Sequence, residues 1–425
     1  MNSILSEYYT KNLGIGGDVL TLAETAEREL AARFAAAEAI GEYNQLKVLD
    51  AMRKNRLSEA HFAATTGYGY NDIGRECTER IFADVFCAQS GLVRPQIVSG
   101  THALSLAMAA NLKHGDELLS ATGRPYDTLC GVIGIRAARG SLAENGVAYR
   151  QADLKADGSP DFEAIKAAIG PKTRMAAIQR SKGYAWRKSL SVKDIADIIE
   201  CVKRVDKHII CMVDNCYGEF VEAREPSEYG ADLVVGSLIK NPGGGIAPSG
   251  GYIVGSDECV ENAACRLTAP GLGKELGASL GHTQPILQGL FLAPNAVCGA
   301  VKGAIFAAKL AESLGFAANP ASSETRSDIV QAIRMNSEAQ LLAFCEAIQK
   351  MSPVDSHVKP VPWDMPGYGC PVVMAAGTFV SGASIELSAD APIREPYTAF
   401  FQGGLSWFHA KAGVIAALNA AARVS

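Results

Sequence analysis

The chain has 425 residues and a formal net charge of −5, with 48% hydrophobic and 20% charged residues. Its length predicts roughly two to three structural units with a large buried core. The mild acidity and the lack of any Lys/Arg-rich run exclude a nucleic-acid surface, and we find no apolar run long enough to predict a membrane span.

The first sixty residues have the pattern of helices. From residue 24 to residue 56, apolar residues recur at spacings of three and four, with charged residues between them. We therefore expect an N-terminal helical segment over residues 1–60. The opening stretch, MNSILSEYYTKNLG, lacks the basic, apolar and small-residue regions of a signal peptide, so we expect a cytoplasmic protein without a membrane partner.

Strand-like and helical stretches alternate from about residue 95 onward. The strand-like runs cover residues 96–99, 117–121, 147–152, 174–180, 208–214 and 233–237. This alternation predicts a large α/β domain over residues 61–295, with a mostly parallel sheet covered on both faces. The run 250–255 follows too soon for a helical crossover, so we expect it to pair antiparallel or to sit elsewhere in the sheet.

The character of the chain changes beyond residue 295. We predict a smaller α+β domain over residues 296–425. This part of the chain has two helical stretches, then a Pro/Gly-rich region, two strand-like runs and a final helix. The 11 cysteines are scattered and none forms a C-x-x-C pair. This spacing indicates buried free thiols, and we predict no metal site.

Two candidate ligand-binding positions follow predicted strands, at the edge where ligands bind to an open parallel sheet. Gly100 and Thr101 open a helix, where free N–H groups suit a phosphate, although an ordinary capped helix start has the same pattern. Asp214 ends the run 208–214. Its carboxylate is placed either to pair with a protonated ring nitrogen of a bound heterocycle or to cap a turn.

The stretch SLIKNPGGG places Lys240 between an apolar strand and a run of glycines. A desolvated amine with a lowered pKa forms an imine with a carbonyl compound, whereas most lysines are simply solvated. The apolar strand and the glycines favour a buried nucleophile. Ser237, three residues earlier, is placed to offer its hydroxyl to the same phosphate.

At these motifs the chain resembles the fold-type-I pyridoxal-5′-phosphate enzymes. Within them it is similar to the cystathionine γ-synthase/methionine γ-lyase group, in its aluminium-resistance or methionine γ-lyase-like branch. The likeness runs from about residue 60 to the C-terminus, and it is carried by GYGYNDIGRECTERIFADVF, SGTHALSLAM, VDNCYGEF, SLIKNPGGGIAPSGGYIVG and PIREPYTAFFQGGLSW.

The resemblance implies an α/β fold of the aspartate aminotransferase (PLP-dependent transferase) type. It also implies a carbon–sulfur lyase that acts on a sulfur-containing amino acid through a Schiff base, followed by β- or γ-elimination. An aminotransferase, a γ-replacement enzyme and a non-catalytic regulatory protein that binds the cofactor remain alternatives. A dinucleotide-dependent oxidoreductase is less favoured, because no G-x-G-x-x-G follows the first predicted strand.

The resemblance also implies roles for single residues. Lys240 would hold pyridoxal 5′-phosphate covalently, Asp214 would face the pyridine nitrogen, and Tyr126 would stack on the ring, with His102 as a rival. Gly100, Thr101 and Ser237 would bind the phosphate.

Other implied roles involve the substrate and a neighbouring subunit. Arg394 would bind the substrate carboxylate, since its planar guanidinium suits bidentate binding. Tyr70 and Arg75, with Tyr68 as the alternate, would reach the phosphate of the neighbouring subunit in a homodimer or homotetramer. The chain departs from better-known lyases at Ile239, which replaces a hydroxyl, and at QRSKGYAWR, which lacks their asparagine-containing motif.

Overall fold

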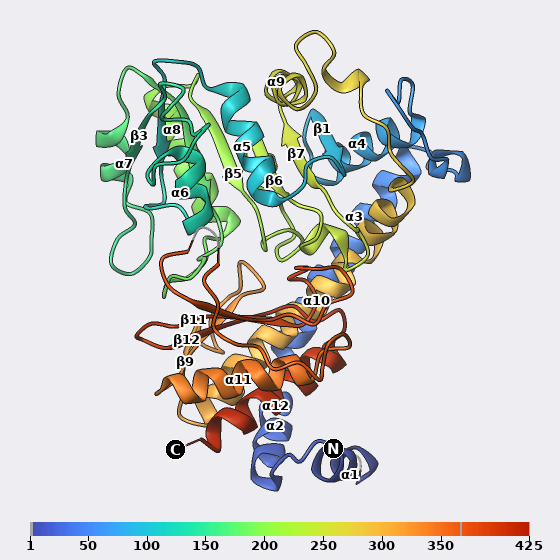
Figure 1. Ribbon diagram of the computed structural model, residues 1–425, viewed down its shortest axis with the longest axis vertical. Coiled ribbons are helices and arrows are strands. Elements are labelled where there is room, and N and C mark those ends of the chain that lie inside the picture. Colours follow the sequence, from blue (N-terminus) through green and yellow to red (C-terminus); the bar gives the residue numbers. More distant parts are fainter. Residues whose placement is uncertain (1–2, 366–367, 425) are drawn as a thin grey trace.

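In the computed structural model, which describes residues 3–365 and 368–424, a sheet of seven strands forms the centre of the larger domain. Figure 1 shows this domain above the smaller one. The order of the strands in this sheet is β1-β7-β6-β5-β4-β2-β3. The strands are β1 (Ser90–Arg94), β2 (Glu117–Ser120), β3 (Ala148–Gln151), β4 (Thr173–Gln179), β5 (Ile210–Asp214), β6 (Leu233–Ser237) and β7 (Gly251–Gly255).

Every strand of this sheet except β7 runs in the same direction. β7 pairs antiparallel with both of its neighbours, β1 and β6, and the pairs formed among the other strands are parallel. The predicted mostly parallel sheet is therefore confirmed, and so is the antiparallel pairing of residues 250–255.

The first strand lies earlier in the chain than its predicted position at 96–99, which is wrong. β1 ends at Arg94, and residues 96–99 form the connection to helix α5 (Gly100–Asn111). Pro95 has no N–H to offer to β7, the one neighbour of this edge strand, and the pairing with β7 ends at Arg94. Ser99 then caps α5, because its Oγ accepts a hydrogen bond of 3.0 Å from the N–H of His102.

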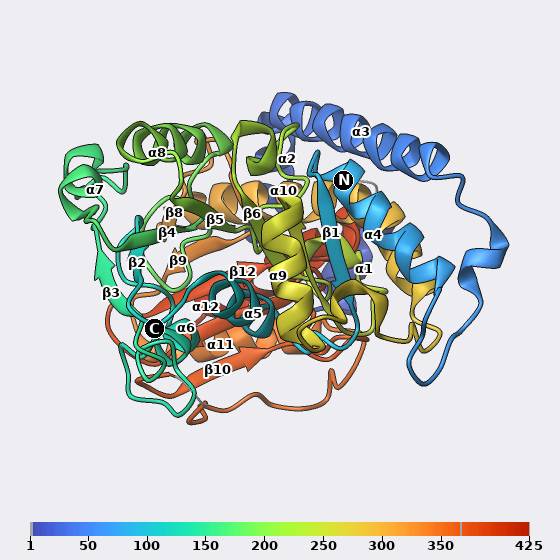
Figure 2. The ribbon, with the colours of Figure 1, turned by 90° about the horizontal axis from the view of Figure 1, so that it is seen from above.

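Helices cover both faces of the large sheet, as Figure 2 shows from above. Because side chains alternate along a strand, Val234 and Val235 of β6 point into different cores. One face packs on α5, α6 (Asp127–Ile133) and α9 (Asp257–Leu267), and the other on α4 (Ile73–Val85) and α8 (Val192–Val205). The short helix α7 (Phe162–Ala168) packs against α8.

A second, smaller sheet follows in the C-terminal part of the chain. It has the order β10-β11-β12-β9-β8, and all its strand pairs are antiparallel. The strands are β8 (Ala317–Asn319), β9 (Gln331–Arg334), β10 (Val372–Ala375), β11 (Ser388–Pro392) and β12 (Thr398–Gln402). Helices α11 (Glu338–Lys350) and α12 (Trp407–Ala422) pack together, and α11 covers this sheet.

The long helix α10 (Thr283–Ser313) connects the two domains and passes through the boundary that we placed between residues 295 and 296. Contrary to our prediction, it is long and apolar enough to cross a membrane by length and composition, but most of its apolar stretch is buried inside the molecule. It packs along α3 (Ala31–Lys54). The N-terminal helices α1 (Ser3–Lys11) and α2 (Gly17–Glu29) precede α3.

Candidate active site

A cavity of about 600 Å³ lies beyond the carboxyl ends of β4, β5 and β6, and the small domain contributes its opposite wall. This is the position where open parallel sheets bind ligands. Seven of the residues singled out from the sequence line it: Gly100, Thr101, Tyr126, Asp214, Ser237, Lys240 and Arg394. The fold therefore brings most of the candidate residues together, although they are spread over almost three hundred positions of the chain.

Lys240 follows β6 and precedes a short 3-10 helix, Asn241–Gly243. Its Nζ lies 3.9 Å from the centroid of the Tyr217 ring. Tyr217 itself has a left-handed backbone with φ of 73°, an unusual conformation for a residue other than glycine. The lysine amine is thus held against an aromatic face inside the cavity.

The glycines after Lys240 have a different function from the one that the sequence suggested. A β-carbon at Gly243 would lie 1.7 Å from the carbonyl oxygen of Leu238, and one at Gly244 would lie 2.4 Å from that of Gly289 in α10. Neither glycine lines the cavity. They allow the loop to pack tightly against α10, which fixes the backbone that carries Lys240, and they make no close approach to a ligand.

Asp214 and Lys240 form the charged centre of the cavity. Burial raises the pKa of Asp214 above its ordinary value, and the charge of Lys240 opposes this rise. Burial alone would lower the pKa of Lys240, but the pKa is raised overall by the surrounding Cys216, Tyr217 and Asp214. The lowered pKa that we expected for this lysine from the sequence is therefore wrong, although its burial is confirmed. The backbone N–H of Cys216 donates a hydrogen bond of 3.1 Å to Asp214 Oδ1. A cationic ligand nitrogen beside Asp214 would favour its ionised form further.

The start of α5 forms an anion-binding end of the cavity. Gly100 and Thr101 are the first two residues of the helix, so their N–H groups have no partner within it. A β-carbon at Gly100 would lie 3.2 Å from Cβ of Ser237 and 3.5 Å from Sγ of Cys216. Glycine therefore lets α5 begin close to Ser237. The free N–H groups of this helix start and the Ser237 hydroxyl both line the cavity, and such groups suit a phosphate.

Tyr126 is held in place from two sides. Its hydroxyl lies 2.9 Å from Oγ1 of Thr101, and its backbone N–H donates a hydrogen bond of 3.0 Å to Oε1 of Gln179. Burial, followed by the negative charge of Asp214, raises the pKa of the Tyr126 hydroxyl. The ring is thus neutral and fixed on the cavity wall. Gln179 belongs to the segment QRSKGYAWR, whose contribution the sequence left open.

Four predicted residues do not reach the cavity within one chain: His102, Tyr68, Tyr70 and Arg75. His102 does not line it, and its Nδ1 lies 3.2 Å from the N–H of Val98, as in a helix-start histidine. Tyr68 and Tyr70 are 72% and 54% exposed. A contact of these tyrosines with the site of a neighbouring subunit stays a prediction.

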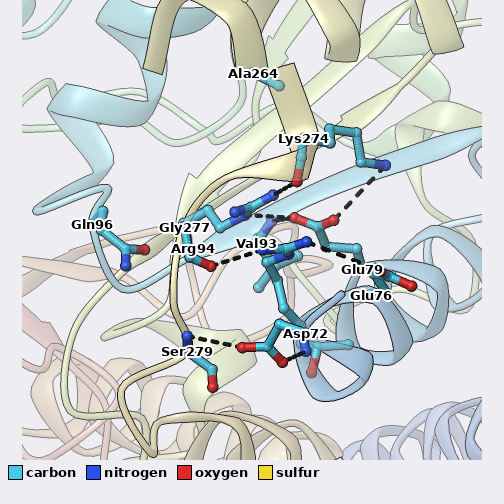
Figure 3. A network of polar contacts seen from close by, with 12 residues as sticks. Asp72, Glu76, Glu79, Val93, Arg94, Gln96, Ala264, Lys274, Gly277 and Ser279 are labelled. Carbon is cyan, nitrogen blue, oxygen red and sulfur yellow. Dashed lines mark hydrogen bonds and ion pairs between the residues drawn. The ribbon is translucent and has the colours of Figure 1, made fainter. Parts of the chain in front are cut away.

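Arg75 is buried in a polar network of its own chain. Its Nη1 donates hydrogen bonds to the carbonyl oxygens of Gly69, at 2.6 Å, and Gly277, at 2.9 Å. In the same network Nε of Arg94 donates to Oε1 of Glu79 at 2.7 Å (Figure 3). These bonds fix the loop that carries Tyr68 and Tyr70, so Arg75 acts on that loop rather than on the cavity of its own chain.

The wall opposite Lys240 contains residues that the sequence did not reveal. Asp390 of β11 lines the cavity, whereas its neighbours Ala389 and Ala391 point into the core. Burial raises the pKa of Asp390 to about 6, and hydrogen bonds from Tyr184 and Gln402 oppose this rise. The available signal was the alternation in SADAP, which places polar residues on one face of a fully buried strand.

Lys182 is a second buried lysine on the cavity wall. Its Nζ donates a hydrogen bond of 3.0 Å to the carbonyl oxygen of Asn319. Burial lowers its pKa to about 8, and Asp328 opposes this change. Because its amine is bound to the small domain, Lys182 contributes to the junction of the two domains and is less suited than Lys240 to carry a cofactor.

Comparisons with known proteins identify relatives along nearly the whole chain. The model of the methionine gamma-lyase family matches residues 19–422, so the likeness begins well before residue 60. The protein YnbB of Bacillus subtilis is 51% identical over 384 residues, which cover 90% of this chain and 91% of YnbB. The L-methionine gamma-lyase of Pseudomonas putida is 28% identical over 50% of this chain and 48% of its own length.

A solved structure agrees with the fold in detail. The carbon-sulfur lyase involved in aluminum resistance from Clostridium novyi NT is 48% identical, and the alignment covers 99% of both chains with a TM-score of 0.95. The family resemblance and the fold class that we expected from the sequence are both confirmed.

Proposed function

The chain belongs to the methionine gamma-lyase family, and from this premise we propose that it is a pyridoxal-phosphate-dependent lyase. It cleaves a carbon–sulfur bond of a sulfur-containing amino acid by β- or γ-elimination. The observation that carries the proposal is Lys240, whose amine lies in a cavity beside Asp214 and near the free N–H groups of α5. The description of the Clostridium novyi relative as a carbon-sulfur lyase supports the same reaction class.

The cavity residues fit pyridoxal 5′-phosphate at each of its functional groups. Lys240 offers an amine for the aldehyde, and Asp214 offers a carboxylate for the pyridine nitrogen. The start of α5 and Ser237 suit the phosphate, and Tyr126 presents an aromatic face to the ring. When bound, the cofactor supplies an electron sink for the electron pair left by removal of the Cα proton.

The residues of this chain supply orientation, charge and proton transfer. In its neutral form, Nζ of Lys240 would accept the Cα proton, because it is the amine that lies in the cavity against the Tyr217 ring. The carboxylate of Asp214 keeps a facing ring nitrogen protonated. Arg394, on the cavity wall, binds the substrate carboxylate through its planar guanidinium. The buried walls exclude water from the reacting atoms.

The first test is the substitution Lys240→Ala. The variant should lose the visible absorbance band of bound cofactor and all thiol release, because no other residue is proposed to hold the aldehyde. Lys193→Ala, at an exposed lysine of α8, is the matched control and should keep both properties. A Lys240→Ala protein that retains the band and turns over substrate contradicts the proposal.

A substrate panel separates this lyase from its alternatives. The purified protein is supplied with L-methionine, L-cysteine or cystathionine, and thiol, ammonia and oxo acid are measured. Release of all three supports elimination, whereas an oxo acid without thiol indicates an aminotransferase. In a parallel assay with a second thiol added as acceptor, a new thioether without ammonia indicates γ-replacement. A protein that binds the cofactor but converts nothing is the non-catalytic alternative.

We also propose that the protein acts in the cytoplasm as a homodimer or homotetramer. The exposed pair Tyr68 and Tyr70, whose ring centroids lie 5.6 Å apart, is held on a fixed loop and is available to a second copy. Light scattering should give the mass of at least two chains. A monomer with full activity contradicts the shared site.

A further inference from the structure

The small domain places a carboxylate in the cavity that the proposed reaction does not use. Asp390 lies on the second strand of the small sheet, where it pairs in register with Met374 of β10 and Phe400 of β12. It is 8% exposed and lines the same cavity as Lys240, on the opposite wall. The strand position therefore holds the carboxylate rigidly toward the reaction site.

Asp390 has no full positive partner of its own. Within residues 3–365 and 368–424 it forms no ion pair with a lysine, arginine or histidine. The amide of Gln402 lies at 3.3 Å, and the Tyr184 hydroxyl donates a second, neutral hydrogen bond. Lys240 acts on it only at longer range, and the proposed function commits that amine to the cofactor. A buried carboxylate held by neutral donors alone is costly unless a ligand supplies charge.

Aromatic rings surround the same part of the cavity. The ring centroids of Tyr184 and Tyr368 lie 5.6 Å apart, and that of Phe400 lies 5.1 Å from Tyr184. Tyr184 and Tyr368 line the cavity together with Asp390. A carboxylate beside tyrosines on a cavity wall suits an organic cation, because the carboxylate supplies the opposite charge and nearby aromatic rings add a favourable cation–π contribution.

We propose that Asp390, Tyr184 and Tyr368 form a subsite for a positively charged group on the substrate side chain. The enzyme accordingly prefers sulfur-containing amino acids whose leaving group carries an ammonium, and it discriminates against neutral analogues of equal length. This inference rests on the proposed function and assigns its substrate class. Asp390 binds the distal cation, whereas Asp214 remains reserved for the cofactor.

The test uses two substrates of matched length that differ by one charge. S-aminoethyl-L-cysteine carries an ammonium where S-propyl-L-cysteine carries a methyl group, and the homocysteine homologues serve if γ-elimination operates. Wild-type enzyme should favour the charged compound by about tenfold or more in kcat/KM, as expected for a hydrogen bond to a charged group. In Asp390→Asn the ratio should fall to about one.

Asp127→Asn is the matched control, because it removes the same charge from the same cavity, on the wall that the large domain contributes. It should leave the preference for the charged compound unchanged. A wild-type ratio near one, or a ratio that Asp390→Asn does not alter, overturns the proposal. Equal losses for both substrates in Asp390→Asn also overturn it, since they assign Asp390 a positioning role through Tyr184.

A binding experiment decides the inference separately from the lyase reaction. L-Lysine and L-norleucine have no sulfur leaving group and differ only in the terminal ammonium. Calorimetry of the cofactor-loaded wild-type protein should give a lower Kd for L-lysine, and this result needs neither turnover nor a folded variant. If the sulfur substrates release no thiol while L-lysine is still preferred, the proposed function fails and the cation subsite stands. Equal Kd values overturn the subsite.

Discussion

At Asp390 the molecule keeps a buried carboxylate whose charge changes near neutral pH. Burial raises its pKa from an ordinary value of 3.8 to about 6. The other titratable groups that act on it are Tyr184, Tyr217, Tyr368, Cys345 and Lys240. Burial raises the pKa of the three tyrosines and of Cys345, so these groups stay neutral where Asp390 ionises.

This pKa predicts a pH dependence of the charged-substrate preference. Above about pH 6 Asp390 is ionised and the preference is complete, and below this pH the carboxyl is neutral and the preference fades. The measurement is the kcat/KM ratio of S-aminoethyl-L-cysteine to S-propyl-L-cysteine as a function of pH. A ratio that stays constant while pH falls through 6 contradicts the assignment.

The same shift predicts how Asp390 affects folding. A carboxyl whose pKa is raised on folding favours the folded state at low pH, and this contribution is lost as pH rises from about 4 through about 6. Asp390→Asn should therefore raise the Tm of the cofactor-free protein by a few degrees at neutral pH, with little gain at pH 4. Thermal melts at both pH values check this, and a lower Tm of the variant at neutral pH contradicts it.

A substitution at Gly100 should weaken the binding of pyridoxal phosphate without lowering the stability of the fold. In Gly100→Ala the new methyl group lies against Ser237 and Cys216, so the Kd for pyridoxal phosphate should rise by about tenfold or more. The helix itself should tolerate alanine, which has the higher helix propensity. Fluorescence titration measures the Kd. Gly17→Ala in α2, where a β-carbon meets nothing within 4 Å, is the control and should leave it unchanged.

At the scale of elements, the loop after β6 and helix α10 behave as one unit. A β-carbon at Gly289 would lie 2.2 Å from the carbonyl oxygen of Gly243, so Gly289→Ala should displace the loop that carries Lys240. We expect a loss of about 1–3 kcal/mol in the free energy of unfolding, together with lower cofactor occupancy. Denaturant titration and absorbance measure the two effects. Gln288→Ala, at the exposed neighbouring position, should change neither.

The elements that the sequence predicts well are those with strong local signals. Buried strands such as β5 and β6 have uninterrupted apolar runs, and the short connection before β7 permits only an antiparallel neighbour. β1 was misplaced because SGLVRPQIVS contains two short apolar runs around Pro95, and pairing with β7 selects the first. The site residues at strand ends follow from the same topology, which is why Asp214 and Lys240 were found.

Two of the residues that sequence reasoning missed, Asp390 and Tyr368, come from the opposing domain, whereas Tyr184 and Tyr217 follow strands of the large sheet. Asp390 and Tyr368 reach the cavity only because the small sheet docks over the carboxyl ends of the large one. No local pattern reveals this docking, since it depends on how α10 directs the chain. The resemblance to known enzymes supplied roles for Gly100 and Tyr126, which their local sequence left open.

At the scale of the whole molecule, the cavity links the two domains, so its occupation should stabilise both. A ligand that binds only the folded state adds about 2.7 kcal/mol at a hundredfold excess over its Kd. Pyridoxal phosphate should therefore raise the Tm of the wild-type protein and have a much smaller effect on Lys240→Ala. Pyridoxal, which lacks the phosphate, is the control ligand. An equal rise with both ligands contradicts phosphate binding at the start of α5.

Because α10 is continuous, it fixes how the small domain is rotated relative to the large domain, and therefore how the two walls of the cavity face each other. Each residue of an α-helix advances the chain by about 100° around the axis, so a single insertion near its midpoint would swing everything beyond it through that angle. Asp390 and Arg394 would then no longer line the cavity, whereas the anion-binding start of α5 would keep its structure. In related proteins we therefore expect insertions and deletions in the surface loops and not within α10.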